Sequence, residues 1–151
     1  MKRIFTAAAL IALLAAPMFA RAEEVSEEEE IKVLVLSAYV DGLINAGDLD
    51  KTRAGFHPQF VLLGLQNGDL TRLPITEWIA SVEKRKAQAQ AQDHKPPLMT
   101  GRFLDVDVTG TAAMVKIELH REGVHIFTDY LTLYKFPDGW KIVGKIYFRH
   151  S

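Results

Sequence analysis

The C-terminal part of the chain restricts the fold most strongly, because it has the pattern of two long neighbouring strands. Residues 124–136 and 140–150 are rich in β-branched and aromatic side chains, and a Pro-Asp-Gly turn joins them. Successive side chains of a strand point to opposite faces of a sheet, so Asp129 shares the apolar face with Phe127 and Leu131. A carboxylate on an apolar face costs free energy unless it has a partner. Asp129 is therefore either a structural hydrogen-bonding residue or the polar anchor of a pocket.

The part of the chain before these strands predicts three helices. Ser26 stands three residues before Glu29 in the pattern of a capping box, and apolar residues recur at helical spacing through residue 43. Asp48 has the character of an N-cap for a short second helix that ends near Ala54. A third helix follows Thr76, the expected N-cap, and continues into an Ala/Gln-rich tract.

Further strands surround and follow the third helix. An Asn-Gly pair at 67–68 predicts a hairpin between strands 60–66 and 69–73. Two more strands are expected over residues 103–108 and 113–120, before the final pair. Helices gathered on one side of an antiparallel sheet define the α+β class, here as one domain. A curved sheet wrapped over a helix encloses a concave space, which is a natural ligand site.

The first 22 residues have the composition of a secretory signal peptide. Lys2 and Arg3 precede an apolar run over residues 4–16, which is shorter than the ~20 residues that a membrane span needs. Small residues in Ala20-Arg21-Ala22 predict cleavage after Ala22. We therefore expect residues 23–151 to form a periplasmic or secreted domain that has no membrane attachment after cleavage. The chain contains no cysteine, so its stability must come from its core.

Charge and motifs exclude several classes of function. Removing the three basic residues of the segment 1–22 from the chain's 18 leaves 15 basic and 19 acidic side chains, a net charge of −4. This charge argues against a nucleic-acid partner. We find no phosphate-binding glycine loop and no nucleophile motif, so no cofactor is expected. His120 and His125 flank a turn and have no metal-ligand spacing, so no metal is expected either.

Four short motifs in this order carry a family resemblance. They are Asn45-Ala46-Gly47-Asp48, Phe56-His57-Pro58, Thr128-Asp129-Tyr130-Leu131-Thr132-Leu133 and Asp138-Gly139-Trp140-Lys141-Ile142-Val143. With them the chain resembles the NTF2-like (SnoaL-like) superfamily over nearly all of residues 26–150, and within it the family called "putative lumazine-binding". The resemblance implies a cone, in which a curved antiparallel sheet wraps around a long N-terminal helix with two further helices. The superfamily includes enzymes and non-enzymes, so the fold alone does not assign an activity.

A more distant resemblance to ketosteroid isomerases, in the same superfamily, gives a test residue by residue. Tyr39 stands where those enzymes have an oxyanion-hole tyrosine, Asp129 where they have a protonated aspartate, and Phe148 where some of them have a pocket tryptophan. Their catalytic base falls at about Gly64, which has no side chain to accept a proton. The resemblance therefore implies hydrogen-bond donors without the base.

The candidate catalytic residues are Tyr39, His57 and Asp129, and each has a structural alternative. Asp129 could donate to a ligand as a neutral acid, or it could accept hydrogen bonds from Tyr39, Trp78 or a backbone N–H group. Tyr39 could point its hydroxyl into the same cavity, or it could pack in the core with its hydroxyl satisfied. His57 could move a proton near neutral pH, or it could bond local backbone. The candidate ligand-binding residues are Tyr39, Phe56, Phe60, Trp78, Phe127, Asp129 and Phe148.

Three functions remain open at this point. The leading hypothesis is an exported domain that binds a small apolar or aromatic molecule in a conical pocket without catalysis. The second is a lyase or isomerase that works by enolisation, with Tyr39 and Asp129 as oxyanion donors and His57 as the proton shuttle. The third is a protein-interaction or structural dimer module. Tyr130 and Tyr134 on the outer sheet face predict a homodimer surface, as is common in the superfamily.

Overall fold

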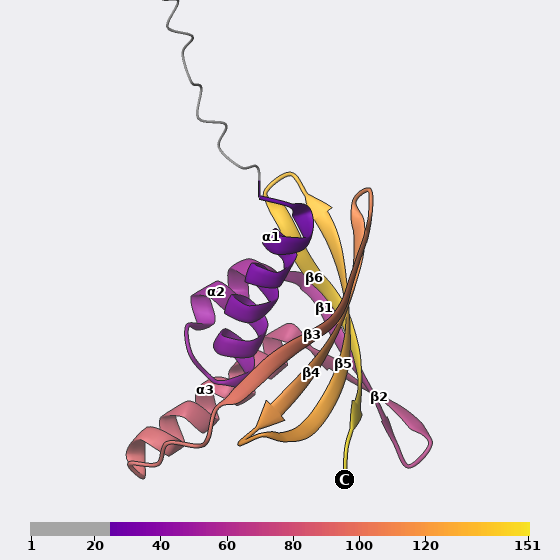
Figure 1. Ribbon diagram of the computed structural model, residues 1–151. Coiled ribbons are helices and arrows are strands. Elements are labelled where there is room, and N and C mark those ends of the chain that lie inside the picture. Colours follow the sequence, from indigo (N-terminus) through magenta and orange to yellow (C-terminus); the bar gives the residue numbers. More distant parts are fainter. Residues whose placement is uncertain (1–24) are drawn as a thin grey trace, which may run out of the picture.

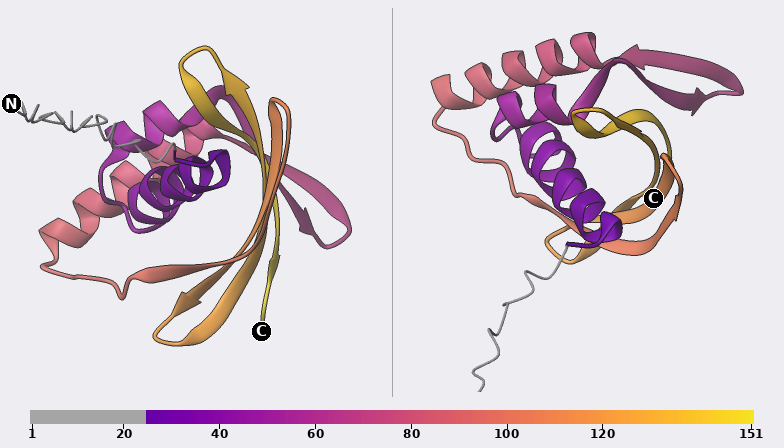
Figure 2. Two further views of the ribbon diagram at one scale, coloured as in Figure 1. Left: turned by 45° about the horizontal axis from the view of Figure 1, so that its top comes forward. Right: turned by 90° about the horizontal axis from the view of Figure 1, so that it is seen from above.

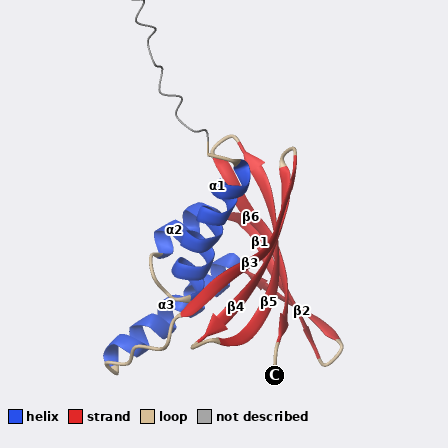
Figure 3. Ribbon diagram, viewed as in Figure 1, coloured by secondary structure: helices blue, strands red, loops and turns tan. Residues whose placement is uncertain are grey.

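In the computed structural model, which describes residues 25–151, helices cover one face of a curved, open, six-stranded sheet (Figure 1). The predicted signal peptide, residues 1–22, lies outside the described residues. Seen from above, the sheet curls toward the first helix (Figure 2). Helices therefore line the concave face, while the convex face carries none of the described helices (Figure 3). This arrangement confirms the predicted α+β class.

The elements follow one another in the predicted order. The helical elements are α1 (Glu27–Leu34), η1 (Val35–Ile44), α2 (Leu49–Gly55) and α3 (Ile75–Ala91). The strands are β1 (Phe56–Gln66), β2 (Asp69–Pro74), β3 (Met99–Thr109), β4 (Ala112–Arg121), β5 (Val124–Phe136) and β6 (Gly139–Arg149). Strands β1 and β3 begin four residues before their predicted starts at 60 and 103, so the Phe56-His57-Pro58 segment belongs to a strand. No helix of residues 25–151 is long and apolar enough to cross a membrane.

The long N-terminal helix changes its hydrogen-bonding pattern halfway. Ser26 caps α1 as predicted, because its Oγ accepts from the Glu29 N–H at 3.3 Å. From Val35 onward the helix is π-helical, and Asn45 donates back five residues to the Val40 carbonyl at 3.0 Å. The sequence predicted one continuous helix without this change. π-Helical turns are rare, and within α-helices they occur frequently at functional sites.

The other two helices begin differently from each other. The Asp48 carboxylate caps α2 as predicted and accepts from the Asp50 N–H at 3.0 Å. Helix α3 begins at Ile75, with Pro74 at the N-cap and no side-chain cap, so the predicted Thr76 cap is wrong. The restricted φ of Pro74, −62°, closes β2 and lets the helix begin at the next residue.

The sheet has the strand order β2-β1-β6-β5-β4-β3. Four of its pairings are antiparallel, as predicted, and β1 and β6 run parallel, a pairing that the sequence did not predict. The parallel pairing places the first strand beside the last. The β1–β2 hairpin consequently projects from the body of the molecule (Figures 1 and 2).

A β-bulge interrupts the last strand and changes which residues face the helices. Thr132 pairs with Gly144 and Leu133 with Ile142, so Val143 is an extra residue. A bulge of this kind shifts the side-chain alternation by one residue. Residues of even number before the bulge and of odd number after it therefore share the concave face.

The core lies between this concave face and the helices. Its fully buried side chains include Ile31, Val35, Tyr39 and Leu43 from the first helix and Ile117, Leu119, Leu131 and Leu133 from the sheet. One carboxylate and one ammonium group are buried beside this apolar layer, and they define the candidate site.

Candidate functional site

Asp129 lies on the concave face of β5 and is fully buried. It pairs with Ile117 on β4 and Tyr147 on β6, so its side chain points toward the helices from the middle of the sheet. Its Oδ2 accepts a short hydrogen bond of 2.5 Å from the Tyr39 hydroxyl, which reaches it from η1. This contact matches the structural alternative, in which Asp129 accepts from Tyr39.

Lys145 is the third member of this buried group, and the sequence did not identify it as a site residue. Its Nζ donates to the Tyr39 hydroxyl oxygen and lies 3.0 Å from Asp129 Oδ1. The Lys145 side chain is only 5% exposed, which is unusual for a lysine. The three residues form a closed set, here called the Tyr–Asp–Lys triad, with one member each from η1, β5 and β6.

The bulge at Val143 explains why the sequence did not identify Lys145 and why it misplaced Phe148. Strict alternation from Trp140 places Phe148 on the concave face and Lys145 on the convex face. Because the bulge reverses the faces after Ile142, Lys145 points inward. Phe148 is instead 62% exposed and pairs with Thr128 rather than with Asp129. The prediction of Phe148 as a pocket residue is therefore wrong.

Burial and charge set the electrostatics of the triad. Burial, reinforced by the Asp129 carboxylate, raises the pKa of Tyr39 well above its usual value, so its hydroxyl stays protonated and donates. Burial lowers the pKa of Lys145, and the neighbouring carboxylate opposes that change. The 3.0 Å contact of Lys145 with Asp129 Oδ1 lacks hydrogen-bond geometry. Oδ1 therefore keeps unused acceptor capacity in a buried position.

Three aromatic rings surround the Lys145 ammonium. Its Nζ lies 4.7 Å from the ring centroid of Tyr39, 5.4 Å from that of Trp78 and 5.3 Å from that of Tyr147. Such distances allow cation–π attraction, which compensates in part for the lost hydration of the ammonium. Tyr147 is 40% exposed, so one ring of this enclosure reaches the surface.

The other predicted aromatic residues divide between core and site. Phe56 and Phe60 are buried and pack edge to face with centroids 4.8 Å apart. Phe60 also lies against Trp78, at 6.2 Å between centroids. Phe127 is half-buried on the concave face and packs against Tyr147 at 5.8 Å. The first two rings thus belong to the core, while Phe127 is only partly buried.

His57 does not reach the triad. Its ring stacks on Phe136 at 4.9 Å, and its Nδ1 accepts from the Gln59 N–H at 3.2 Å. Phe136 ends β5, seven residues from Asp129. The structure therefore does not support the enolisation scheme, which required His57 beside Tyr39 and Asp129.

A surface pocket of about 330 Å³ lies elsewhere, between α2, the start of β1 and α3. Its walls include Phe56, Pro58, Ile75 and Ile79, with Arg53 and Glu83 among its polar residues. Arg53 and Glu83 form an ion pair of 2.5 Å there. None of the triad residues lines this pocket, so it is separate from the candidate site.

Comparison with known proteins agrees with this architecture. The family model described as "Putative lumazine-binding" matches residues 26–148. A cone of this kind with helices on its concave face defines the class of NTF2-like proteins. The chain belongs to the putative lumazine-binding family within that class. This fold and family fit a ligand-binding domain.

Solved structures support the NTF2-like class. An NTF2-like protein of unknown function from Shewanella baltica is 27% identical, with a TM-score of 0.63, over 85% of this chain and 99% of that one. A second one, from Silicibacter pomeroyi, is 25% identical, with a TM-score of 0.62, over 83% and 100% of the two chains. A putative dehydratase from Streptomyces avermitilis is 16% identical, with a TM-score of 0.54, over 82% and 96%, and shares the fold alone. Among curated protein sequences, none matches this chain.

Proposed function

We propose that this protein is an exported, non-catalytic domain that binds a small, planar aromatic molecule carrying an oxygen acceptor. The ligand would lie against Tyr147 and Phe127 on the concave face, with its oxygen directed at the Lys145 ammonium. The observation that carries the proposal is the Tyr–Asp–Lys triad, which holds a buried cation beneath a partly exposed aromatic ring.

The triad has hydrogen-bonding capacity that its own members do not use. An ammonium group has three N–H donors, and Lys145 makes one hydrogen bond to Tyr39 and one ion contact with Asp129. A ligand oxygen that approached Lys145 beside the Tyr147 ring could receive a further charge-assisted hydrogen bond from the ammonium group. Planar molecules suit this place because the surrounding surface is aromatic.

The absence of a catalytic role is supported by the crowding around Gly64. A Cβ atom at this position would lie 2.8 Å from Thr71 Oγ1 and 3.3 Å from the Tyr147 hydroxyl. A carboxylate side chain would not fit there without rearrangement of its neighbours. The position at which ketosteroid isomerases have their base is therefore closed to a base here.

Export and dimerisation complete the proposal. The Lys-Arg start, the apolar run and the small residues before Glu23 support cleavage after Ala22 and a periplasmic or secreted location. The convex face has exposed Tyr134, Ile146 and Phe148, at 53%, 53% and 62%, which supports a homodimer through the sheet. N-terminal sequencing of exported protein should begin at Glu23. Light scattering should give twice the chain mass; a monomer would contradict the dimer.

Tryptophan fluorescence tests ligand binding directly, because the chain has only two tryptophans. A Trp140→Phe variant retains only Trp78, whose ring centroid is 5.4 Å from Lys145 Nζ, and a Trp78→Phe variant provides the reference. We would titrate both with lumazine, riboflavin and a ketosteroid. Saturable quenching by a probe in the first variant and not in the second supports the site. Absence of saturable quenching with all three probes would contradict it.

Lys145→Met tests the polar contact, with the exposed Lys84→Met as the charge-matched control. We expect affinity to fall by about tenfold or more in Lys145→Met, since a charge-assisted hydrogen bond contributes about 1.5–3 kcal/mol. Lys84→Met should bind as the parent does. Equal affinity in both variants would refute the role of Lys145, and conversion of a bound probe to a product would refute the non-catalytic assignment.

A further inference from the structure

A second group of polar side chains lies on the convex face and plays no part in the proposed ligand site. It consists of Glu118 and His120 from β4, His125 and Thr128 from β5, and His150 just after β6, and is called here the histidine cluster. One ligand atom from each of Glu118, His120 and His125 can be chosen so that all three lie within 4.8 Å of one another. His150 joins through Thr128, whose hydroxyl lies 2.9 Å from His150 Nε2.

A second β-bulge brings these residues together. Leu119 pairs with Phe127 while His120 pairs with His125, so Ile126 is an extra residue in β5. Without the bulge, His125 would share the concave face with Phe127. With it, the rings of His120 and His125 stack at 4.9 Å, on the same face as Glu118. The sequence spacing therefore did not reveal this cluster.

The hydrogen bonds leave ligand atoms available on two of these side chains. His125 Nε2 lies 3.0 Å from the Phe127 carbonyl oxygen, which can only accept, so Nε2 carries the hydrogen and Nδ1 keeps its lone pair. All three contacts of the Glu118 carboxylate, two from Arg102 and one from His120, are to Oε2. Its Oε1 is left for another partner. A backbone carbonyl that holds a histidine tautomer is a common outer-shell contact at metal sites.

We propose that Glu118, His120 and His125, with His150 as the fourth donor, bind a divalent transition-metal ion of the zinc type on the convex face. Imidazole and carboxylate groups are the usual ligands of such ions, at about 2.0–2.2 Å. Ligand atoms around a tetrahedral ion lie about 3.3 Å apart at these bond lengths, so the cluster has to contract by roughly 1–2 Å. Rotation of the partly exposed histidine side chains supplies this movement.

The positive charge of Arg102 disfavours metal binding at Glu118, and this leads to a specific prediction. Its guanidinium donates to Glu118 Oε2 from Nε at 3.0 Å and from Nη2 at 2.6 Å. A cation bound to the carboxylate meets this positive charge, so the ion has to bind while Arg102 moves toward solvent. The Arg102 side chain is 66% exposed and can make that movement. Replacing it with glutamine should therefore tighten metal binding.

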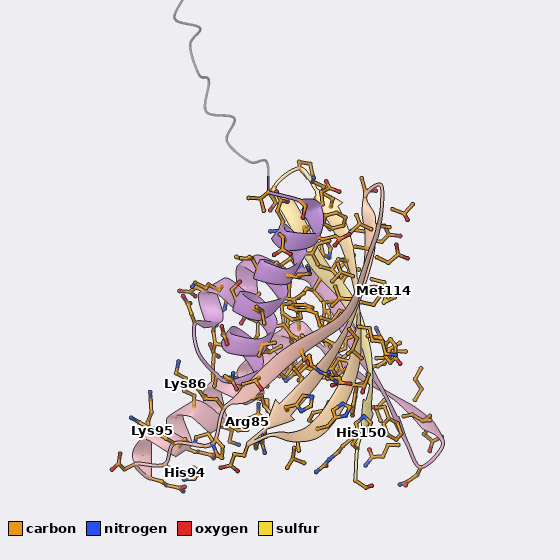
Figure 4. All side chains as sticks on the ribbon, viewed as in Figure 1. Arg85, Lys86, His94, Lys95, Met114 and His150 are labelled. Atoms are coloured by element: carbon orange, nitrogen blue, oxygen red, sulfur yellow. The ribbon has the colours of Figure 1, made fainter. Side chains whose placement is uncertain are left out.

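The test uses the untagged protein after treatment with EDTA, titrated with Zn²⁺ by calorimetry and with Co²⁺ by visible absorption. Wild type should bind one ion per chain, and Co²⁺ should give the intense ligand-field bands of a four-coordinate site. His120→Gln and His125→Gln should each weaken binding by about tenfold or more, and Arg102→Gln should strengthen it. His57→Gln and His94→Gln are matched controls, and both should bind as wild type does. Figure 4 shows His94 at the end of α3, far from His150.

Circular dichroism of each variant in the absence of metal should match wild type, so that weakened binding reports on the ligands rather than on folding. No binding of either ion by wild type would overturn the proposal. Unchanged affinity in both His120→Gln and His125→Gln would also overturn it, as would loss of binding in His94→Gln.

Discussion

Replacing Asp129 with alanine should destabilise the protein more than a typical core substitution, because it leaves the Lys145 ammonium buried without a counter-charge. Asp129 is fully buried and the Lys145 side chain is 5% exposed, so solvent screens this pair very little. Removing one partner of a buried ion pair typically costs about 3–5 kcal/mol. The free energy of unfolding of a domain is about 5–15 kcal/mol, so the variant should lose a large share of it.

Urea denaturation followed by tryptophan fluorescence measures this loss. At about 4 °C per kcal/mol, the melting temperature should fall by roughly 12–20 °C. The double variant Asp129→Leu/Lys145→Met removes both charges, and we expect it to recover most of the loss, because paired apolar substitutes often match a buried ion pair. Raising the pH should also reduce the deficit of Asp129→Ala. The unfolded chain keeps the Lys145 proton up to about pH 10.4, whereas the folded variant favours the neutral amine.

Asp107→Ala is the matched control, since Asp107 is an exposed aspartate in a strand. It should change the free energy of unfolding by less than about 0.5 kcal/mol. A loss below about 1 kcal/mol in Asp129→Ala would refute the reasoning. A double variant less stable than Asp129→Ala would refute it as well, because the cost would then not arise from the orphaned charge.

Three further outcomes follow from the same structure. Tyr39→Phe removes the donor to a buried carboxylate oxygen and should cost about 1–3 kcal/mol in urea denaturation, with no cost indicating that water replaces the hydroxyl. Hydrogen bonds from His120 and Arg102 lower the pKa of Glu118 to about 2, so the free energy of unfolding should fall as the pH drops from about 4.5 toward 2. Glu118→Gln should flatten this pH dependence, and an unchanged slope would contradict the contribution of these contacts. Gly42→Ala would place a Cβ atom 2.4 Å from Thr52 Oγ1 and should lower the free energy of unfolding by about 1–3 kcal/mol. An unchanged melting temperature would show that η1 and α2 can move apart at this contact.

Much of the fold could be predicted because local rules agree with the tertiary structure. The caps at Ser26 and Asp48, the Asn-Gly hairpin and the alternation in β4 and β5 all follow from interactions within a few residues. The placement of Asp129 on the apolar face of its strand and of Tyr39 on the buried face of its helix were within reach for the same reason. Each follows from periodicity along one element.

The parts that escaped prediction depend on contacts between distant segments. The parallel pairing of β1 with β6 joins the first and last strands, and no local pattern encodes it. The bulges at Ile126 and Val143 each reverse the alternation of a strand, which hid Lys145 and His125 and misplaced Phe148. A bulge has no dependable sequence pattern of its own, because its position depends on how the neighbouring strand fits.

The π-helical winding of η1 has a consequence for how this protein can change over time. Removing one residue ahead of Tyr39 within this helix turns every later side chain by about a quarter of a turn around the helix axis. Such a deletion would direct a different residue of this apolar segment at the Asp129 carboxylate. A change in segment length, rather than a substitution, can therefore exchange the group that faces the buried carboxylate. In this fold, the insertion or loss of a single codon in the first helix can change which side chain meets Asp129 at the centre of the sheet.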